Sequence, residues 1–303
     1  DPASKAFTSM HELCWGEDGI IGDNVWSKIV NIPDLRQRVA LEGWGGVDQS
    51  RLLIYQLHPL RFIQKAGPDS ESQVAFNIVA GNLVKGHLNQ LPFTAIEMLP
   101  VHEFAGEISW GYDPAAFFLV EETYGGPDFL ADLVRSAHQN KKAVILDVVL
   151  NHLGMISPLL GDHFHDSMVS GETIFGKTLH FRSLGAEHLI QSVVHILEAY
   201  NIDGYRFDCC EVITRDDSDC INGMRNPPNW QEIHIGRRGG WDFLCQVRDH
   251  LRDAAIALGR PVPLLISENG ADGIFNAAGF PRGSQWDIDT FFKLREFTEY
   301  GGG

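Results

Sequence analysis

The chain has 303 residues, of which 44% are hydrophobic and 21% are charged, and this composition is typical of a globular protein. The formal net charge of −16 at pH 7 argues against nucleic acid or an anionic membrane surface as a partner, because both are negatively charged themselves. No apolar stretch reaches the length of a membrane-spanning helix. The length is sufficient to bury a large core in one domain.

Apolar runs that end in polar or turn residues predict six strands, and apolar residues at helical spacing predict helices between them. The strands are expected at 51–58, 93–100, 143–149, 204–207, 262–267 and 285–289, and the helices at 128–140, 188–200 and 241–258. Because strands and helices alternate, the sequence predicts an α/β fold with a parallel sheet. The pattern favours a TIM (β/α)8-type barrel with only about six βα units in this chain.

The first 50 residues show no clear periodicity and differ in this from the rest of the chain. We interpret residues 1–50 as a lead-in that packs on the barrel, and residues 51–303 as a partial barrel domain. Long connections follow several of the strands, at 59–92, 100–127, 153–187 and 208–240. Because the loops after the strands form the active face of a barrel, they predict an extended cleft.

The five cysteines form no even framework and include no CxxC pair, which is typical of buried thiols in a reducing compartment. The chain begins at Asp1, without methionine and without the composition of a signal or transit peptide. We therefore interpret it as a processed or trimmed product whose start does not reveal its location. The cysteine usage favours a reducing intracellular compartment, either the cytoplasm or an organelle.

Charged side chains stand at the ends of two apolar strands, with Arg206 and Asp208 on one and Glu268 on the other. Two carboxyl groups in one cleft are the minimum that cleavage of a glycosidic bond requires. Arg206 lies two residues before Asp208, on the same side of the strand, and would favour the ionised form that a nucleophile needs. Glu268 has apolar neighbours and is expected to have a raised pKa that suits a general acid. The alternative is a buried ion pair that only orders a loop.

Further polar and aromatic residues lie near these strand ends. Asn151 and His152 extend the strand that carries Asp147, which predicts contact with sugar hydroxyl groups; the alternative for His152 is a hydrogen-bonded core residue. Trp110 and Tyr112 offer aromatic faces on which sugar rings commonly stack, against the alternative of ordinary loop packing.

Two clusters of potential metal ligands are interpreted as surface loops, so no metal site is predicted. The segment 162–166 has two histidines at i and i+2, which in a loop more often face solvent. The segment 216–219 is not an EF-hand, because Ile221 occupies a ligand position and the bidentate glutamate is absent.

Together these motifs resemble those of the α-amylase superfamily, glycoside hydrolase family 13. DVVLNH at 147–152, GYRFD at 204–208 and the glutamate of ISEN at 266–269 are similar to its first three motifs. LPVHEF at 99–104 and WGYDP at 110–114 look most like glycogen branching enzymes and glycosyltrehalose trehalohydrolases. The resemblance extends over about residues 50–295.

The resemblance implies a retaining enzyme that acts on α-1,4- or α-1,6-linked glucose polymers or maltooligosaccharides through a β-glycosyl–enzyme intermediate. Asp208 would be the nucleophile and Glu268 the general acid/base, with Arg206 orienting the nucleophile. Asp147, His152 and Tyr112 would line the subsite for the attacked glucose. The resemblance implies no organic cofactor, and it suggests calcium near Asn151 by analogy alone.

The chain departs from the family pattern at two places. Cys209, Cys210 and Glu211 follow Asp208 where the family often has a histidine or lysine, and no His-Asp pair follows Gln285, where a fourth motif is expected. Six strands cannot close an eight-stranded barrel. We therefore expect that a longer polypeptide or a partner protein completes the barrel, or that the sheet is remodelled. The alternatives to an enzyme are an inactive structural subunit of a larger complex and a glucan-binding module.

Overall fold

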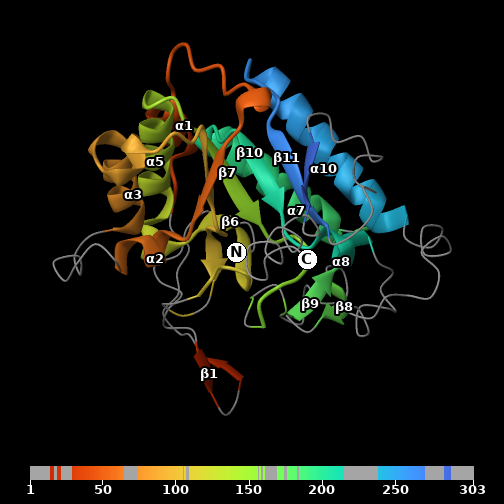
Figure 1. Cartoon of the computed structure of the whole chain (residues 1–303). Coiled ribbons are helices and arrows are strands. Elements are labelled where there is room, and N and C mark those ends of the chain that lie inside the picture. The colour runs from red at the N-terminus through yellow and green to blue at the C-terminus, as the bar shows by residue number, and fades with distance from the viewer. Residues whose placement is uncertain are drawn as a thin grey trace, which may run out of the picture.

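A computed structural model of the chain describes residues 14–16, 19–21, 29–64, 74–104, 106, 109–155, 157, 160, 169–173, 176–182, 184–214, 238–269 and 283–287. Its central element is a sheet of six parallel strands (Figure 1). The strands are β3 (Ile54–Leu57), β4 (Ala95–Met98), β7 (Ala143–Val148), β10 (Gly204–Phe207), β11 (Leu264–Asn269) and β12 (Gly283–Asp287).

These six strands lie side by side in the order in which they occur along the chain. A doubly wound sheet reverses its strand order at a switch point, whereas a (β/α) barrel adds each strand beside the previous one. The observed order therefore confirms the predicted TIM-barrel type of fold. In the described part of the chain, β3 and β12 stand at the two edges of the sheet.

Long helices cover the outer side of the sheet and contact one another in chain order. In Figure 1, α3 and α5 lie to the left of the strands and α10 lies to their right. Helix α3 contacts α5, α5 contacts α7, and α7 contacts α10. They are α3 (Ala75–Lys85), α5 (Gly126–Gln139), α7 (Leu184–Tyr200) and α10 (Arg238–Ala257). Helix α5 begins as its sequence predicts, with proline in its first turn after Gly125, whose φ of 123° favours glycine.

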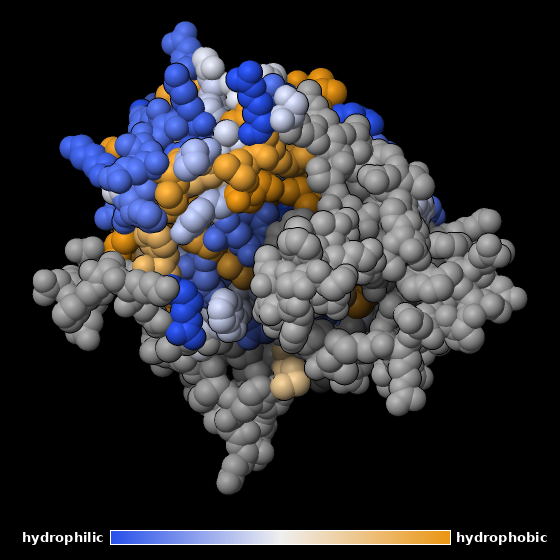
Figure 2. Space-filling model, viewed as in Figure 1, coloured by the Kyte–Doolittle hydropathy of each residue, from blue (hydrophilic) through white to orange (hydrophobic). Residues whose placement is uncertain are grey.

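Successive residues of each strand face opposite sides of the sheet, and this separates two cores. On β7, Val144 and Leu146 belong to the large cluster between the sheet and the helices. Ala143 and Ile145 belong to a smaller apolar cluster on the inner side, and Asp147 follows them at the same spacing. The inner side therefore changes from apolar to charged along the strand. Figure 2 shows hydrophobic and hydrophilic areas next to each other in the middle of the described surface.

The structure confirms all six predicted strands and the three predicted helices to within a few residues. It also adds elements in regions that we expected to be loops or a lead-in. These are β1 (Cys14–Gly16), β2 (Gly19–Ile21), α1 (Ile32–Val39), η1 (Gln49–Arg51), α2 (Pro59–Gln64), α4 (His87–Gln90), β5 (His102–Phe104), β6 (Pro114–Val120), η3 (Glu122–Tyr124), β8 (Val169–Thr173), β9 (Gly176–Leu179) and α8 (Cys210–Thr214), besides α3. Strands β5 and β6 form an antiparallel pair, as do β8 and β9.

The lead-in contacts the helical layer through α1, which packs against α5 and α7. The Arg36 guanidinium lies 2.6 Å from Glu198 of α7, and Arg38 lies 2.8 Å from Asp128 of α5. The predicted boundary at residue 50 stays a prediction. None of the helices in the described ranges combines the length and the apolar character that crossing a membrane requires.

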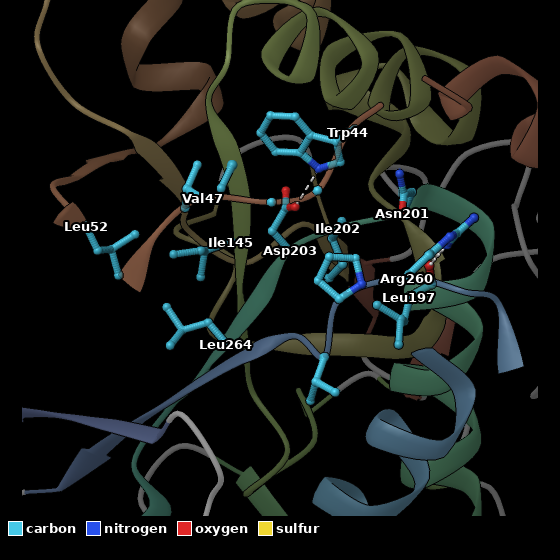
Figure 3. Close-up of a pocket in the computed structure, with 15 residues that line it drawn as sticks. Trp44, Val47, Leu52, Ile145, Leu197, Asn201, Ile202, Asp203, Arg260 and Leu264 are labelled. Carbon is cyan, nitrogen blue, oxygen red and sulfur yellow. Dashed lines mark hydrogen bonds between the residues drawn. The ribbon is translucent and has the colours of Figure 1, made fainter. Parts of the chain in front are cut away.

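A pocket lies at the edge of the sheet where the strands begin (Figure 3). Trp44 donates from Nε1 to Asp203 Oδ1 at 2.8 Å, and His138 stacks on Trp44 with 4.2 Å between ring centroids. His138 Nε2 is also 2.8 Å from Asp203 Oδ2. These contacts fasten the lead-in to α5 and to the start of β10. In (β/α) barrels this edge serves stability, and the chemistry takes place at the other edge.

Candidate functional site

The predicted catalytic residues meet at the carboxyl edge of three neighbouring strands. Strand β10 lies between β7 and β11, and Arg206 is in register with Asp147 on one side and Ile266 on the other. Asp208 and Glu268 each lie two residues beyond these positions. All four charged side chains therefore reach the same end of the inner face, because residues two apart on a strand point the same way.

Arg206 is the centre of this cluster and contacts three carboxyl groups at once. Its Nη1 lies 2.9 Å from Asp147 Oδ1, from Asp147 Oδ2 and from Asp208 Oδ1. Its Nη2 lies 2.9 Å from Glu268 Oε1. Burial opposes the charge of Arg206, but the neighbouring carboxylates, Asp147 first among them, raise its pKa above the ordinary value. The guanidinium therefore remains a cation although it is buried.

Asp147 is the most buried carboxyl group of the cluster, with no exposed side-chain surface. Burial raises its pKa to about 7, although Arg206 acts in the opposite direction. Tyr112 Oη donates a hydrogen bond of 2.6 Å to Asp147 Oδ2. Burial and the charge of Asp147 together raise the pKa of Tyr112, so its phenol stays protonated and able to donate.

Donors hold both side-chain oxygens of Asp208. Arg206 contacts Oδ1, and Asn151 Nδ2 donates to Oδ2 at 2.9 Å and to the backbone carbonyl oxygen at 2.8 Å. The backbone N–H of Asp208 donates to the Val148 carbonyl oxygen at 3.0 Å. The carboxyl group is thus fixed in position with 14% of its side chain exposed. This is the arrangement that an attacking carboxylate needs.

Glu268 differs from Asp208 in its surroundings. Burial raises its pKa and the charge of Asp208 adds to this effect, whereas Arg206 and the Cys209 N–H lower it. The Cys209 N–H donates to Glu268 Oε2 at 2.9 Å. Cys209 has a φ of 39°, a strained conformation for a residue other than glycine, and such strain is concentrated at functional sites. A carboxyl group with a raised pKa beside a second, well-held carboxylate is the usual arrangement of an acid and a nucleophile.

His152 is buried and supports the site from behind. Its Nε2 is hydrogen-bonded to the Tyr112 carbonyl oxygen at 2.7 Å, and its Nδ1 to Asn151 Oδ1. Burial lowers the pKa of His152. Both partners are acceptors and a neutral imidazole carries one N–H, so the ring donates to one of them at a time. Through these contacts His152 positions Tyr112 and Asn151, which in turn contact Asp147 and Asp208. The predicted contact of His152 with a sugar hydroxyl group stays a prediction.

Trp110 differs from the other predicted residues, because the structure places it outside the hydrogen-bonded cluster. Its side chain is 57% exposed, with Arg61 5.7 Å from the ring centroid and His58 at its edge. The turn between Trp110 and Tyr112 depends on Gly111, which has a φ of 87°. A Cβ atom on Gly111 would lie 2.5 Å from the Pro100 carbonyl oxygen. This turn directs Tyr112 toward Asp147 and leaves Trp110 on the surface.

Sequence reasoning missed two contributions to the site. The first is the backbone N–H of Cys209, which a sequence does not reveal because its direction depends on a single φ angle. The second is Glu97, which is fully buried in β4 and hydrogen-bonded to Gln56. Glu97 left a signal in the sequence, since it is the one charged residue in the run Phe93 to Pro100.

The Asn151 side chain is hydrogen-bonded to His152 through Oδ1 and to Asp208 through Nδ2, and the calcium site suggested near Asn151 stays a prediction. In the described ranges, no group of three or more histidine, cysteine or acidic side chains could hold a metal. Cys209, Cys210 and Cys245 are free thiols. The clusters at 162–166 and 216–219, the Glu211 side chain and everything after residue 287 lie outside the description.

Comparisons with known proteins agree with the motifs. The α-amylase catalytic domain family matches residues 86–167, the part that contains Tyr112, Asp147 and His152. A malto-oligosyltrehalose trehalohydrolase from Saccharolobus solfataricus is 33% identical over 55% of this chain and 29% of its own length. One from Arthrobacter ramosus is 29% identical over 82% of this chain and 39% of its own length. The chain thus spans well under half the length of these relatives.

Among solved structures, a pullulanase from Paenibacillus barengoltzii in complex with maltohexaose and α-cyclodextrin has a similar fold. The TM-score is 0.59 at 18% identity, and the match covers 89% of this chain and 41% of the pullulanase. At this identity the likeness supports the fold alone. The family match, the sequence relatives and the three strand-end motifs show that the chain is similar to proteins of the α-amylase superfamily.

Proposed function

We propose that this chain carries the catalytic pair of a retaining α-glucan hydrolase or transglycosylase. The observation that carries the proposal is the contact of one buried guanidinium, Arg206, with both Asp208 and Glu268 at 2.9 Å. Carboxyl groups that share one guanidinium are close together. Retaining glycosidases have their two carboxyl groups about 5–5.5 Å apart, whereas inverting enzymes need about 6.5–9.5 Å to admit a water molecule.

In the first step, Asp208 attacks the anomeric carbon while Glu268 gives its proton to the glycosidic oxygen. The bond between that carbon and that oxygen breaks, and the glycosyl unit becomes an ester of Asp208. In the second step, Glu268 takes a proton from water or from a sugar hydroxyl group, whose oxygen then attacks the anomeric carbon and releases Asp208. Water gives hydrolysis and a sugar gives transfer. The raised pKa of Glu268 suits the first step, since the acid must begin protonated.

The names of the relatives support an α-glucan as the substrate. Two are malto-oligosyltrehalose trehalohydrolases, and a pullulanase from Bacillus subtilis is 30% identical over 56% of this chain. Asp147, His152 and Tyr112 would line the subsite for the glucose unit that is attacked, with Asn151 beside them. We propose that Trp110, on the exposed rim, would contact a neighbouring sugar.

The proposal is tested with maltooligosaccharides of defined length, by measuring new reducing ends and the chain lengths of the products. We expect turnover by the wild-type chain and a loss of at least about a thousandfold in Asp208→Asn, which keeps the shape but not the nucleophile. Asp253→Asn, on a side chain that is 67% exposed on α10, makes the same chemical change and should retain full activity. Equal activity in the two variants would refute the mechanism.

The same experiment decides between the enzyme and the alternatives without chemistry. A glucan-binding module would retain the oligosaccharide in equilibrium binding but release no reducing ends. A structural subunit would neither bind nor cleave it, and would co-purify with another protein. The mutual contacts of Arg206 with its three carboxylates would then serve only to order the strand ends.

A further inference from the structure

Glu97 lies beneath the cluster of charged residues, inside the barrel. It is in register with Gln56 on β3 and with Ile145 on β7, and its side chain is completely buried. Ile145 belongs to the inner apolar cluster, and Asp147 lies two residues further along the same face. Glu97 is therefore on the inner side of the barrel, one layer below Asp147.

The surroundings of Glu97 supply a hydrogen-bond donor to only one of its two carboxyl oxygens. Gln56 Nε2 donates to Glu97 Oε1 at 2.8 Å. In the described part of the chain, no hydrogen-bond partner lies within reach of Oε2, which is buried. A buried charge that lacks a partner costs far more free energy than a buried neutral hydroxyl group. A neutral carboxyl group and an amide can instead share a hydrogen bond whichever way the amide of Gln56 is turned.

Two charged groups act on Glu97, Arg206 on β10 and Glu268 on β11, whereas Gln56 on the neighbouring strand β3 is neutral. Burial is the largest effect and raises the pKa of Glu97; Glu268 adds to it, and Gln56 and Arg206 oppose it. Arg206 already serves three other carboxyl groups.

We propose that Glu97 is a positioning residue, whose buried carboxyl group is held uncharged and leaves the charge of Arg206 to Asp147, Asp208 and Glu268. A fourth carboxylate would compete for the same guanidinium and weaken its hold on the catalytic pair. The uncharged state of Glu97 is argued from its burial and from its single hydrogen-bond donor, Gln56. The effect of this state on catalysis rests on the proposed function.

The first test compares the unfolding of the wild-type chain with that of Glu97→Gln between about pH 5 and about pH 8. A buried acid with a raised pKa stabilises the fold fully below its unfolded-state pKa, and this stability is lost as the pH rises through the folded-state pKa. Glutamine does not titrate. The folding equilibrium constant of the variant, relative to that of the wild type, should therefore increase by up to tenfold per pH unit. This increase should continue above the ordinary titration range of a glutamate.

A gain that has already levelled off at about pH 5 would overturn the proposal, because Glu97 would then be ionised in the working range. Glu187→Gln is the matched control, since Glu187 is exposed on α7 and the same charge is removed there. The difference in unfolding free energy between Glu187→Gln and the wild type should stay the same over this pH range. If Glu97→Gln does not fold, the ¹³C NMR titration of the glutamate carboxyl groups in the wild type decides. A carboxyl signal that persists in Glu121→Gln and in Glu268→Gln should remain in its protonated position at about pH 6, and its absence would refute the proposal.

The second test separates this inference from the proposed function. Glu97→Gln should restore most of the kcat that Glu97→Ala loses, with the pH profile of the wild type, because glutamine reproduces the neutral carboxyl group. We expect a loss of at least about tenfold in the alanine variant, since the cavity lets Arg206 shift. If the wild type has no turnover, the proposed function fails while the unfolding comparison still decides the state of Glu97. A pH profile displaced by Glu97→Gln would contradict the positioning role.

Discussion

Replacing Arg206 by methionine tests the physical account of the site without requiring turnover. The change removes the one cation that the structure places against Asp147, Asp208 and Glu268, each at 2.9 Å. It keeps an unbranched, apolar side chain of similar length. The three largely buried carboxyl groups would then lie close together without a neighbouring positive charge.

The expected magnitude follows from these contacts. Charge centres about 4 Å apart attract by about 4 kcal/mol at an effective dielectric constant of about 20, and desolvation of the charges offsets part of this. Breaking a buried ion pair by removing one partner costs about 3–5 kcal/mol. Asp147 is completely buried, so we expect a loss in this range at about pH 8.

The loss should be smaller at about pH 5. Without Arg206 the pKa values of the buried carboxyl groups rise, and an acid whose folded-state pKa is raised loses stability as the pH increases. The assay is urea unfolding at both pH values, followed by tryptophan fluorescence. Arg252→Met is the control: Arg252 is 39% exposed and pairs with Asp249 on the surface of α10, where loss of the pair should cost less than about 1 kcal/mol. Equal destabilisation of the Arg206 variant at both pH values would refute the reasoning.

Two further predictions follow from single residues of the site. Gly111→Ala should destabilise the chain by about 1–3 kcal/mol, because its new Cβ would meet the Pro100 carbonyl oxygen at 2.5 Å; a melting temperature equal to that of the wild type would contradict this. If Glu268 is the general acid, kcat/KM should fall as the pH rises through its raised pKa, since the acid must be protonated. Glu268→Gln should remove most of the activity, and the remaining kcat/KM should no longer fall as the pH rises. If the same fall persists in this variant, it belongs to the titration of another group.

The sequence predicted the parts of the fold that depend on local pattern. Buried parallel strands are continuous apolar runs, so Ala143–Val148 and Gly204–Phe207 were located nearly to the residue. Helix α3 was missed although Phe76, Val79 and Leu83 have helical spacing and are buried. It lies in a stretch where apolar residues also occur between these positions, which obscures the period.

The candidate site was predictable in its residue types but not in its contacts. The motifs indicated that Arg206, Asp208 and Glu268 would converge, because the carboxyl ends of parallel strands share one edge. That Arg206 contacts all three carboxyl groups depends on the register of β10 between its neighbours, which no local pattern encodes. The contact of the His152 Nε2 atom with the Tyr112 carbonyl oxygen could not be read from the sequence, because it joins residues 40 positions apart.

The strand order has a consequence for how the chain acquires its site during synthesis. Strands β7, β10 and β11 are neighbours in the sheet and successive members of it along the chain. Arg206 and its three carboxyl partners therefore come from one continuous stretch, 147–268, and each contact closes a loop of fewer than about 65 residues. Contacts between strands this far apart along the chain form slowly, because the entropy of loop closure must be offset first. Every charged group of the Arg206 cluster is nevertheless present once the chain has left the ribosome as far as Glu268.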